Sequence, residues 1–248
     1  MRFDVITLLP ELVEAVTKVG VTARAVDRNL IDLHCWNPRN YAQDVHRIVD
    51  DRPYGGGPGM VLKAECLLKA IRDAKKMAAK KTKVVYLSPQ GKKFDQMVAR
   101  SASKDEGLIL LCGRYEGIDE RVVALEVDEE WSLGDYVLSG GELAAMVVID
   151  AVTRLLPSVL GHNESAEQDS FSENLLDYEH YTRPVVVENL GVPAVLRSGD
   201  HKAIARWRRK QSIGRTYTRR PDLLTRENSV LSKKDQLLLD EYLKEIES

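Results

Sequence analysis

The sequence predicts an α/β protein with a mainly parallel sheet, followed by a smaller helical part. Three observations support this fold class. Short apolar runs typical of buried strands alternate with helical runs over residues 1–160. Glycine-containing loops follow three of the predicted strands, and the composition changes in the C-terminal part, which contains a basic, helical stretch at 201–226. We therefore expect an α/β domain at 1–160, a linker or lid at 161–176 and a helical domain at 177–248.

The first two predicted strands are short runs near the N-terminus. Residues 3–9 are apolar enough for a buried strand, and residues 30–36 alternate as a second one. Pro10 suits the first turn of a helix between them. Residues 37–60 form a long polar loop that ends in a glycine-rich run at 54–60. That run lacks the Gly-Lys-Ser/Thr ending of a phosphate-binding P-loop, so we interpret it as a surface loop.

Three further strands are predicted at 83–87, at 108–112 and within 122–131. The second of these has no polar alternation, as expected for a strand that is covered on both faces. Cys112 at its end is therefore interpreted as a small buried hydrophobic residue. Helices are predicted at 64–81, 94–103, 118–125, 143–156 and 233–246.

Loops with glycine and polar groups follow these strands at 86–91, 113–117 and 132–142. Glycine allows the main chain to take a positive φ or to approach a ligand closely. Each loop alone could be a simple turn. Ligands of open α/β sheets bind outside the carboxyl ends of the strands, so three such loops together predict a ligand crevice.

The bulk composition is that of an ordinary globular protein, with 44% hydrophobic and 30% charged residues. Three widely spaced cysteines do not form a disulfide framework or a Cys-x-x-Cys site, and they suit a reducing cytoplasm. The five histidines show no metal-ligand spacing. The sequence has neither a run long enough for a membrane span nor a signal-peptide pattern at Met1. We expect a cytoplasmic protein without a membrane partner.

Charges are unevenly placed in the second half of the chain. The predicted helix at 143–156 is apolar nearly all round, and Arg154 within it is either paired with Asp150 or functional. Residues 201–226 hold nine Lys or Arg against one acid, in a chain whose net charge is −2. Such a local excess of positive charge indicates a polyanionic partner.

These features fit more than one function. One is an RNA-modifying enzyme with a small-molecule crevice and an RNA-binding helical part. Another is a non-catalytic RNA-binding or ribosome-assembly factor whose glycine loops are only turns. A third, a nucleotide-dependent enzyme, is disfavoured because the lysine-bearing phosphate motif is missing. Composition leaves the first two open.

Four further stretches carry a resemblance to a known family. They are RPYGGGPGM at 52–60, NESAEQDSF at 163–171, HYTRP at 180–184, and the stretch 207–224 with its WR, KQSIGRT and RRPDLL motifs. Together with the three loops, in the same order and spacing, they resemble the bacterial tRNA (guanine-N1)-methyltransferases of the SPOUT superfamily, which modify guanosine 37.

The resemblance implies an S-adenosylmethionine-dependent enzyme that methylates N1 of guanosine 37 in the anticodon loop of tRNA. It implies a SPOUT-type sheet with a deep trefoil knot, and a homodimer with active sites at the interface. Mg²⁺ is a possible second cofactor, with Glu116 as its possible site. The helical C-terminal domain is then expected to bind tRNA.

The resemblance also implies roles for single residues. Asp169 is expected to act as the general base and Arg154 to stabilise charge on guanine O6. The expected cofactor-binding residues are Tyr86, Leu87, Ser88, Pro89, Gln90, Gly113, Arg114, Tyr115, Glu116, Ser132, Leu133, Gly134, Asp135, Tyr136, Val137, Leu138, Gly140 and Gly141. The expected substrate-binding residues are Gly59, Ser165, Asp177, His180, Arg183, Arg208, Arg209 and Arg215.

Overall fold

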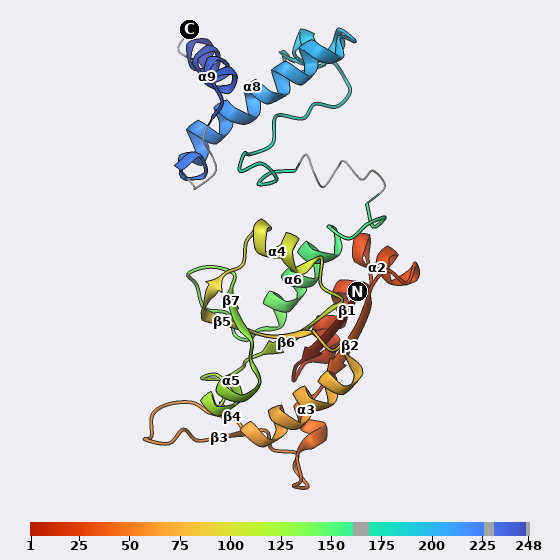
Figure 1. Cartoon of the computed structure of the whole chain (residues 1–248), viewed down its shortest axis with the longest axis vertical. Helices are drawn as coiled ribbons and strands as arrows, with labels where there is room; N and C mark the ends of the chain where they lie inside the picture. Colours follow the sequence, from red (N-terminus) through yellow and green to blue (C-terminus); the bar gives the residue numbers. More distant parts are fainter. Residues whose placement is uncertain (161–168, 226–230, 247–248) are drawn as a thin grey trace. The chain divides into compact units, whose positions relative to one another are not determined.

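The structure, a computed structural model, describes residues 1–160, 169–225 and 231–246. The chain forms two compact units, Met1–Asn163 and Glu164–Ser248. We call them the sheet unit and the helical unit (Figure 1). Each is described by itself. None of the described helices is both long and apolar enough to cross a membrane.

The sheet unit is built on five strands in the order β2-β1-β6-β5-β7, and each neighbouring pair is parallel. A mixed α/β fold with a mainly parallel sheet is thereby confirmed. The strands are β1 (Arg2–Ile6), β2 (Asp32–Trp36), β5 (Lys83–Lys93), β6 (Gly107–Cys112) and β7 (Glu129–Ser132). A separate antiparallel pair joins β3 (Asp50–Asp51) to β4 (Val61–Leu62).

Side chains of the central strands alternate between two apolar cores, one on each face of the sheet. Leu108 and Leu110 of β6 lie in one core, whereas Ile109 and Leu111 lie in the other. Every residue of β6 is buried. The absence of polar alternation in 108–112 correctly indicated a strand covered on both faces.

Helices cover both faces of the sheet (Figure 1). One core includes residues of α1 (Pro10–Glu14), α2 (Gly20–Asp27), α4 (Gln96–Ala102) and α6 (Glu142–Thr153). The other includes α3 (Ala64–Met77) and α5 (Glu120–Glu126). Short 3-10 helices lie at η1 (Ala15–Thr17) and η2 (Pro38–Tyr41). The connections between parallel strands thus pass over the faces, as this architecture requires.

Strand β5 departs from the expected boundary. It pairs with β7 through Leu87, is interrupted, and resumes pairing at Lys92. The four residues between them bulge out of the ladder, and a Cβ on Gly91 would lie 2.4 Å from the Glu130 main chain. The loop expected at 86–91 is therefore an interruption inside one long strand.

The helical unit centres on α8 (His201–Arg219) and α9 (Lys233–Ile246). Leu175, Ile213, Leu238 and Leu239 form its buried core. The two helices approach so closely that a Cβ on Gly214 would lie 2.2 Å from the Tyr242 ring. The remaining elements are β8 (Val186–Val187), β9 (Leu190–Gly191), η3 (Ala194–Arg197) and η4 (Pro221–Thr225).

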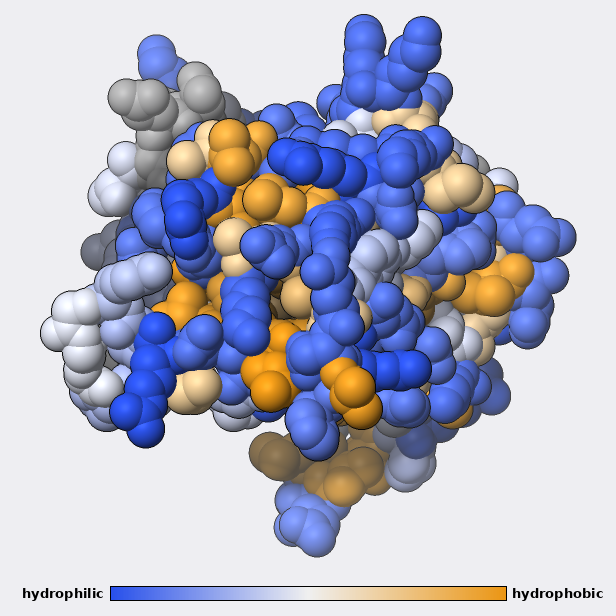
Figure 2. Space-filling view, turned by 90° about the horizontal axis from the view of Figure 1, so that it is seen from below, coloured by the Kyte–Doolittle hydropathy of each residue, from blue (hydrophilic) through white to orange (hydrophobic). Residues whose placement is uncertain are grey.

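The surface is as polar as expected for a chain with 30% charged residues. The face shown in Figure 2 is largely hydrophilic, with hydrophobic residues lying in small groups between the polar ones.

Candidate active site

A crevice of about 260 Å³ lies at the interruption of β5 and beyond the carboxyl ends of β6 and β7. It is close to the lower limit of small-molecule pockets, roughly 300 Å³. The three glycine-containing loops line it. Of the residues expected to bind the cofactor, all line the crevice except Asp135. The lining residues that sequence reasoning missed are Gly117, Trp131, Ser139 and Ala144.

The crevice walls are tightly packed main chain. A Cβ on Gly113 would lie 2.8 Å from the Tyr86 hydroxyl, and one on Gly141 would lie 2.7 Å from the Cys112 Cα. A Cβ on Gly140 would lie 2.5 Å from a carboxylate oxygen of Glu142. These distances are far below ordinary van der Waals contact. A side chain at Gly141 would meet main chain, whereas one at Gly113 or Gly140 would have to displace the Tyr86 or Glu142 side chain. The expectation that glycine lets the chain approach closely holds at these positions.

The loops are joined to one another by main-chain hydrogen bonds. Gly141 donates to the Gly113 carbonyl at 2.9 Å, and Glu116 donates to the Met60 carbonyl at 2.9 Å. A Cβ on Gly59 would lie 2.3 Å from the Glu116 carboxylate. The glycine-rich stretch at 52–60 therefore packs on the loop at 113–117, which brings Gly59 beside a lining residue.

A buried carboxylate supports the crevice from behind. Glu142 begins α6, and its side chain is 1% exposed. Its two oxygens share the single Nε–H of Arg114 at 3.1 and 3.2 Å, and one of them also accepts a hydrogen bond from the Thr7 hydroxyl at 2.9 Å. Arg114 lines the crevice and is 23% exposed. The ion pair therefore fixes the Arg114 side chain against the start of α6.

Burial also controls two ionisable groups beside these loops. It raises the pKa of the Tyr86 phenol to about 12, so this side chain stays a hydrogen-bond donor at neutral pH. It raises the pKa of the Cys112 thiol well above its usual value. Cys112 is 2% exposed and packs in an apolar core, as expected for a small hydrophobic residue.

Arg154 lies at the C-cap of α6, and its amide donates to the Asp150 carbonyl at 3.1 Å. This helix is apolar nearly all round, as expected, but one of its sides is not buried within the described chain. Leu143 and Val147 are each 48% exposed, and Asp150 is exposed as well. These residues recur at helical spacing and define an exposed stripe, which ends at the half-buried Arg154.

The helical unit has a cavity of its own, of about 450 Å³. Asp169, Tyr178, His201, Arg208 and Arg209 are among the residues that line it. The guanidinium of Arg208 lies over the Tyr178 ring, 4.8 Å from its centroid. An acid, an aromatic ring and two arginines thus share one polar cavity, which suits a ligand with both planar and charged parts.

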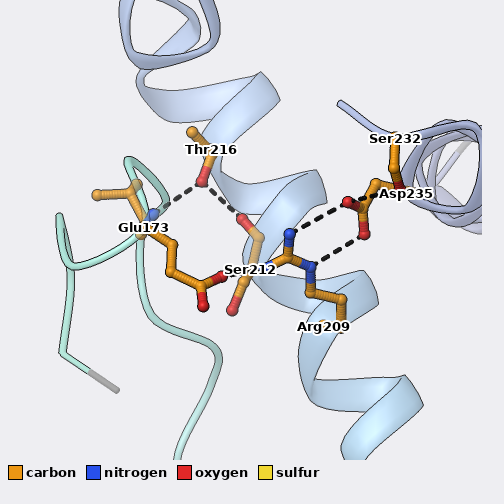
Figure 3. A network of polar contacts seen from close by, with 7 residues as sticks. Glu173, Arg209, Ser212, Thr216, Ser232 and Asp235 are labelled. Atoms are coloured by element: carbon orange, nitrogen blue, oxygen red, sulfur yellow. Dashed lines mark hydrogen bonds and ion pairs between the residues drawn. The ribbon is translucent and has the colours of Figure 1, made fainter. Parts of the chain in front are cut away.

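Several arginines of α8 have partners within the helical unit. Arg209 pairs with Asp235 at 3.0 Å and with Glu173 at 2.5 Å (Figure 3). Arg215 pairs with Glu179 at 2.9 Å. The substrate-binding role that the resemblance implies for these two arginines stays a prediction.

The other expected substrate residues lie in the segment before α8. Asp177 contacts His180 at 2.8 Å, and Arg183 is exposed. Ser165 lies outside the described residues. Within the described part of the chain, no group of three or more His, Cys, Asp or Glu side chains could hold a metal ion. Among the described residues, Glu116 therefore has no neighbouring acids or histidines that would complete a Mg²⁺ site with it.

A parallel sheet with a ligand crevice at its carboxyl edge defines an α/β ligand-binding protein, and the basic helix α8 of the helical unit is typical of a surface that meets a polyanion. Comparison with known proteins gives the family. The family model described as "tRNA (Guanine-1)-methyltransferase TrmD" matches residues 1–226, and the chain belongs to this family.

Curated relatives agree with this assignment. A protein of Pseudoalteromonas translucida is 58% identical over 241 residues, which cover 97% of this chain and 94% of the relative. One of Coxiella burnetii is 59% identical over 241 residues, which cover 97% of each. One of Chromohalobacter salexigens is 57% identical, with 99% and 93% coverage. Each is named tRNA (guanine-N(1)-)-methyltransferase.

Proposed function

We propose that this protein methylates N1 of guanosine 37 in the anticodon loop of tRNA, with S-adenosylmethionine as methyl donor. The observation that carries the proposal is the crevice at 86–91, 113–117 and 132–141, whose lining matches the expected cofactor residues with one exception. Membership of the guanine-1 methyltransferase family supports the same reaction. The second unit, with its basic helix, provides a surface for tRNA.

The chemistry of the crevice lining supports cofactor binding, because polar loop groups lie beside apolar and aromatic side chains. When bound, S-adenosylmethionine supplies an electrophilic methyl group on a sulfonium. Main-chain groups of 133–138, together with Leu87 and Gly113, would hold its adenine and ribose. Tyr115, Gly140 and Gly141 would define the shape of the bound cofactor. At the two glycines, an added Cβ would lie less than 3 Å from neighbouring atoms. Binding of Mg²⁺ at Glu116 is also part of this proposal.

The remaining chemistry concerns the nucleophile. Guanine N1 carries a proton at neutral pH and attacks poorly until that proton leaves. We assign its removal to the carboxylate of Asp169, a role for which a positioned acid within hydrogen-bond reach is suited. The N1 proton goes to Asp169, and the charge that develops on O6 is stabilised by Arg154, which is always charged. The target base must leave its stack to be reached.

Four broader features belong to this proposal. Residues 1–160 would carry the cofactor, 161–176 would act as a linker or lid, and 177–248 would bind tRNA. The sheet would contain the deep trefoil knot of the SPOUT superfamily. The protein would work in the cytoplasm as a homodimer with active sites at the interface. The exposed apolar residues Leu143 and Val147 support the dimer, because such side chains favour burial against a partner.

The test is transfer of labelled methyl from S-adenosylmethionine to an unmodified tRNA transcript. The control transcript has guanosine 37 replaced by adenosine. We expect label in the first transcript and none in the control, and Asp169→Ala should abolish transfer while cofactor affinity is retained. Binding of both transcripts without any label would instead favour a non-catalytic RNA-binding factor.

A further inference from the structure

Residues 169–177 form a compact loop, which we call the Asp169 loop. The Phe171 amide donates to the Leu175 carbonyl at 2.7 Å, and the Asp177 amide donates to the Ser170 hydroxyl at 3.0 Å. Phe171 and Asn174 have positive φ angles of 72° and 59°. Left-handed residues reverse the chain direction, so the loop closes on itself.

One side of the Asp169 loop is anchored in the core of the helical unit. Leu175 is 8% exposed and packs with Ile213 of α8 and with Leu238 and Leu239 of α9. Burial of a leucine side chain is worth about 1.5–3 kcal/mol, so Leu175 holds the loop against the two helices.

A buried hydroxyl supplies the second anchor. Thr216 of α8 is fully buried. Its Oγ1 accepts a hydrogen bond from the Leu176 amide at 2.8 Å and donates one to the Ser212 carbonyl at 2.6 Å. Figure 3 shows this pair of bonds beside the loop. A hydroxyl can donate and accept at once, so Thr216 joins the loop main chain to the helix main chain.

A third anchor comes from Arg209, which lies about two turns before Thr216 on α8. Its Nε and Nη2 donate to the two Asp235 oxygens at 3.0 and 3.1 Å. This bidentate pair fixes the plane of the guanidinium. Nη1 then donates to Glu173 of the loop at 2.5 Å (Figure 3). Glu173 is 71% exposed, so this bond orients the loop more than it stabilises it.

We propose that Thr216 and Arg209 are positioning residues, which together with Leu175 fix the Asp169 loop on α8 and so set the place of the Asp169 carboxylate. Asp169 opens this loop and lines the same cavity as Arg208 and Arg209. The proposal rests on the proposed function, in which Asp169 takes the N1 proton. It gives Arg209 a role inside the protein in place of a phosphate contact.

The main test compares Thr216→Val with Thr216→Ser. Valine keeps the shape but leaves the Leu176 amide without its acceptor, whereas serine keeps the hydroxyl. The rate of methyl transfer to saturating tRNA should fall about tenfold in Thr216→Val, as loss of one buried hydrogen bond implies. Thr216→Ser should restore most of the rate. The dissociation constants for tRNA and S-adenosylmethionine should change less than about twofold.

A second variant tests the loop without touching the core. Glu173→Gln alters an exposed side chain and should leave the fold intact. Positioning predicts a threefold or larger loss of rate, on the order expected for a weakened charged hydrogen bond, at unchanged tRNA affinity. A phosphate role for Arg209 predicts tighter tRNA binding and an unchanged rate, because removing an acid frees the arginine.

Glu241→Gln is the matched control. Glu241 pairs with Arg206, another arginine of α8, and does not line the cavity. Its rate should equal that of the wild type. Unchanged rates in both Thr216→Val and Glu173→Gln would overturn the positioning role, as would rate losses that follow tRNA affinity. If Thr216→Val does not fold, the rate of Glu173→Gln decides whether the positioning role holds. Absence of methyl transfer by the wild type would instead refute the proposed function itself.

Discussion

Replacing Arg114 by methionine should destabilise the sheet unit, because the Glu142 carboxylate would stay buried with its main partner removed. Methionine has nearly the length of arginine but no charge and no donor. Glu142 would then keep one hydrogen bond, from Thr7 at 2.9 Å. A buried charge without its counter-ion is among the costliest defects in a folded protein.

The expected size follows from the burial of the two groups. Breaking a buried ion pair costs about 3–5 kcal/mol. The lower end applies here, about 3 kcal/mol, because Arg114 is 23% exposed and water reaches one side of the pair. Adding Glu142→Gln removes the buried charge, so the double variant should lose only about 1 kcal/mol, the net value of one hydrogen bond.

Urea unfolding followed by tryptophan fluorescence can measure this cycle. A chain of two units need not unfold in one step. Trp36 and Trp131 belong to the sheet unit, whereas Trp207 belongs to the helical unit. A Trp207→Phe background therefore confines the signal to the sheet unit. If Arg114→Met costs less than about 0.5 kcal/mol, or as much as the double variant, the pair is screened by solvent and our reasoning is wrong.

Three further outcomes are expected. Gly141→Ala places a methyl group 2.7 Å from the Cys112 Cα, so it should abolish S-adenosylmethionine binding in calorimetry; retained affinity would show that the wall can yield. The Cys112 thiol, whose pKa burial raises, should resist iodoacetamide until urea unfolds the chain; rapid alkylation of native protein would contradict its burial. The hydrogen bond from Arg209 lowers the pKa of Asp235, so its stabilisation exists above the unfolded value of about 3.9 and is lost as pH falls through the folded value. Asp235→Asn should cost about 1 kcal/mol at pH 7 and less near pH 3, by thermal melts at each pH.

Sequence patterns predicted the structural features that depend on residues close together in the chain. The run at 108–112 indicated a doubly covered strand, and it is one. The crevice followed from a general property of parallel sheets, whose strands end at one edge and bring their loops together. Trp131 was missed because it lies within β7 and is buried in an apolar core, where nothing in the sequence distinguishes a lining side chain from a core one.

Contacts between distant residues could not be predicted in this way. Thr216 binds the Leu176 amide across 40 residues, and no periodicity reports such a pairing. The basic count over 201–226 treated Arg209 as free because its acids, Glu173 and Asp235, lie in other segments. The local excess of positive charge thus indicated a basic surface, and ion pairs with acids from other segments decide which arginines belong to it.

The close-packed main chain of the crevice has a consequence for inhibitor resistance. A compound that hydrogen-bonds to backbone atoms near Gly113, Gly140 and Gly141 contacts groups that no codon change can remove. A side chain at Gly141 would collide with the Cys112 backbone, and one at Gly113 or Gly140 would have to displace the Tyr86 or Glu142 side chain. Such a compound should therefore meet few viable escape variants, whereas one that relies on the exposed Tyr136 or Val137 side chains should select them readily.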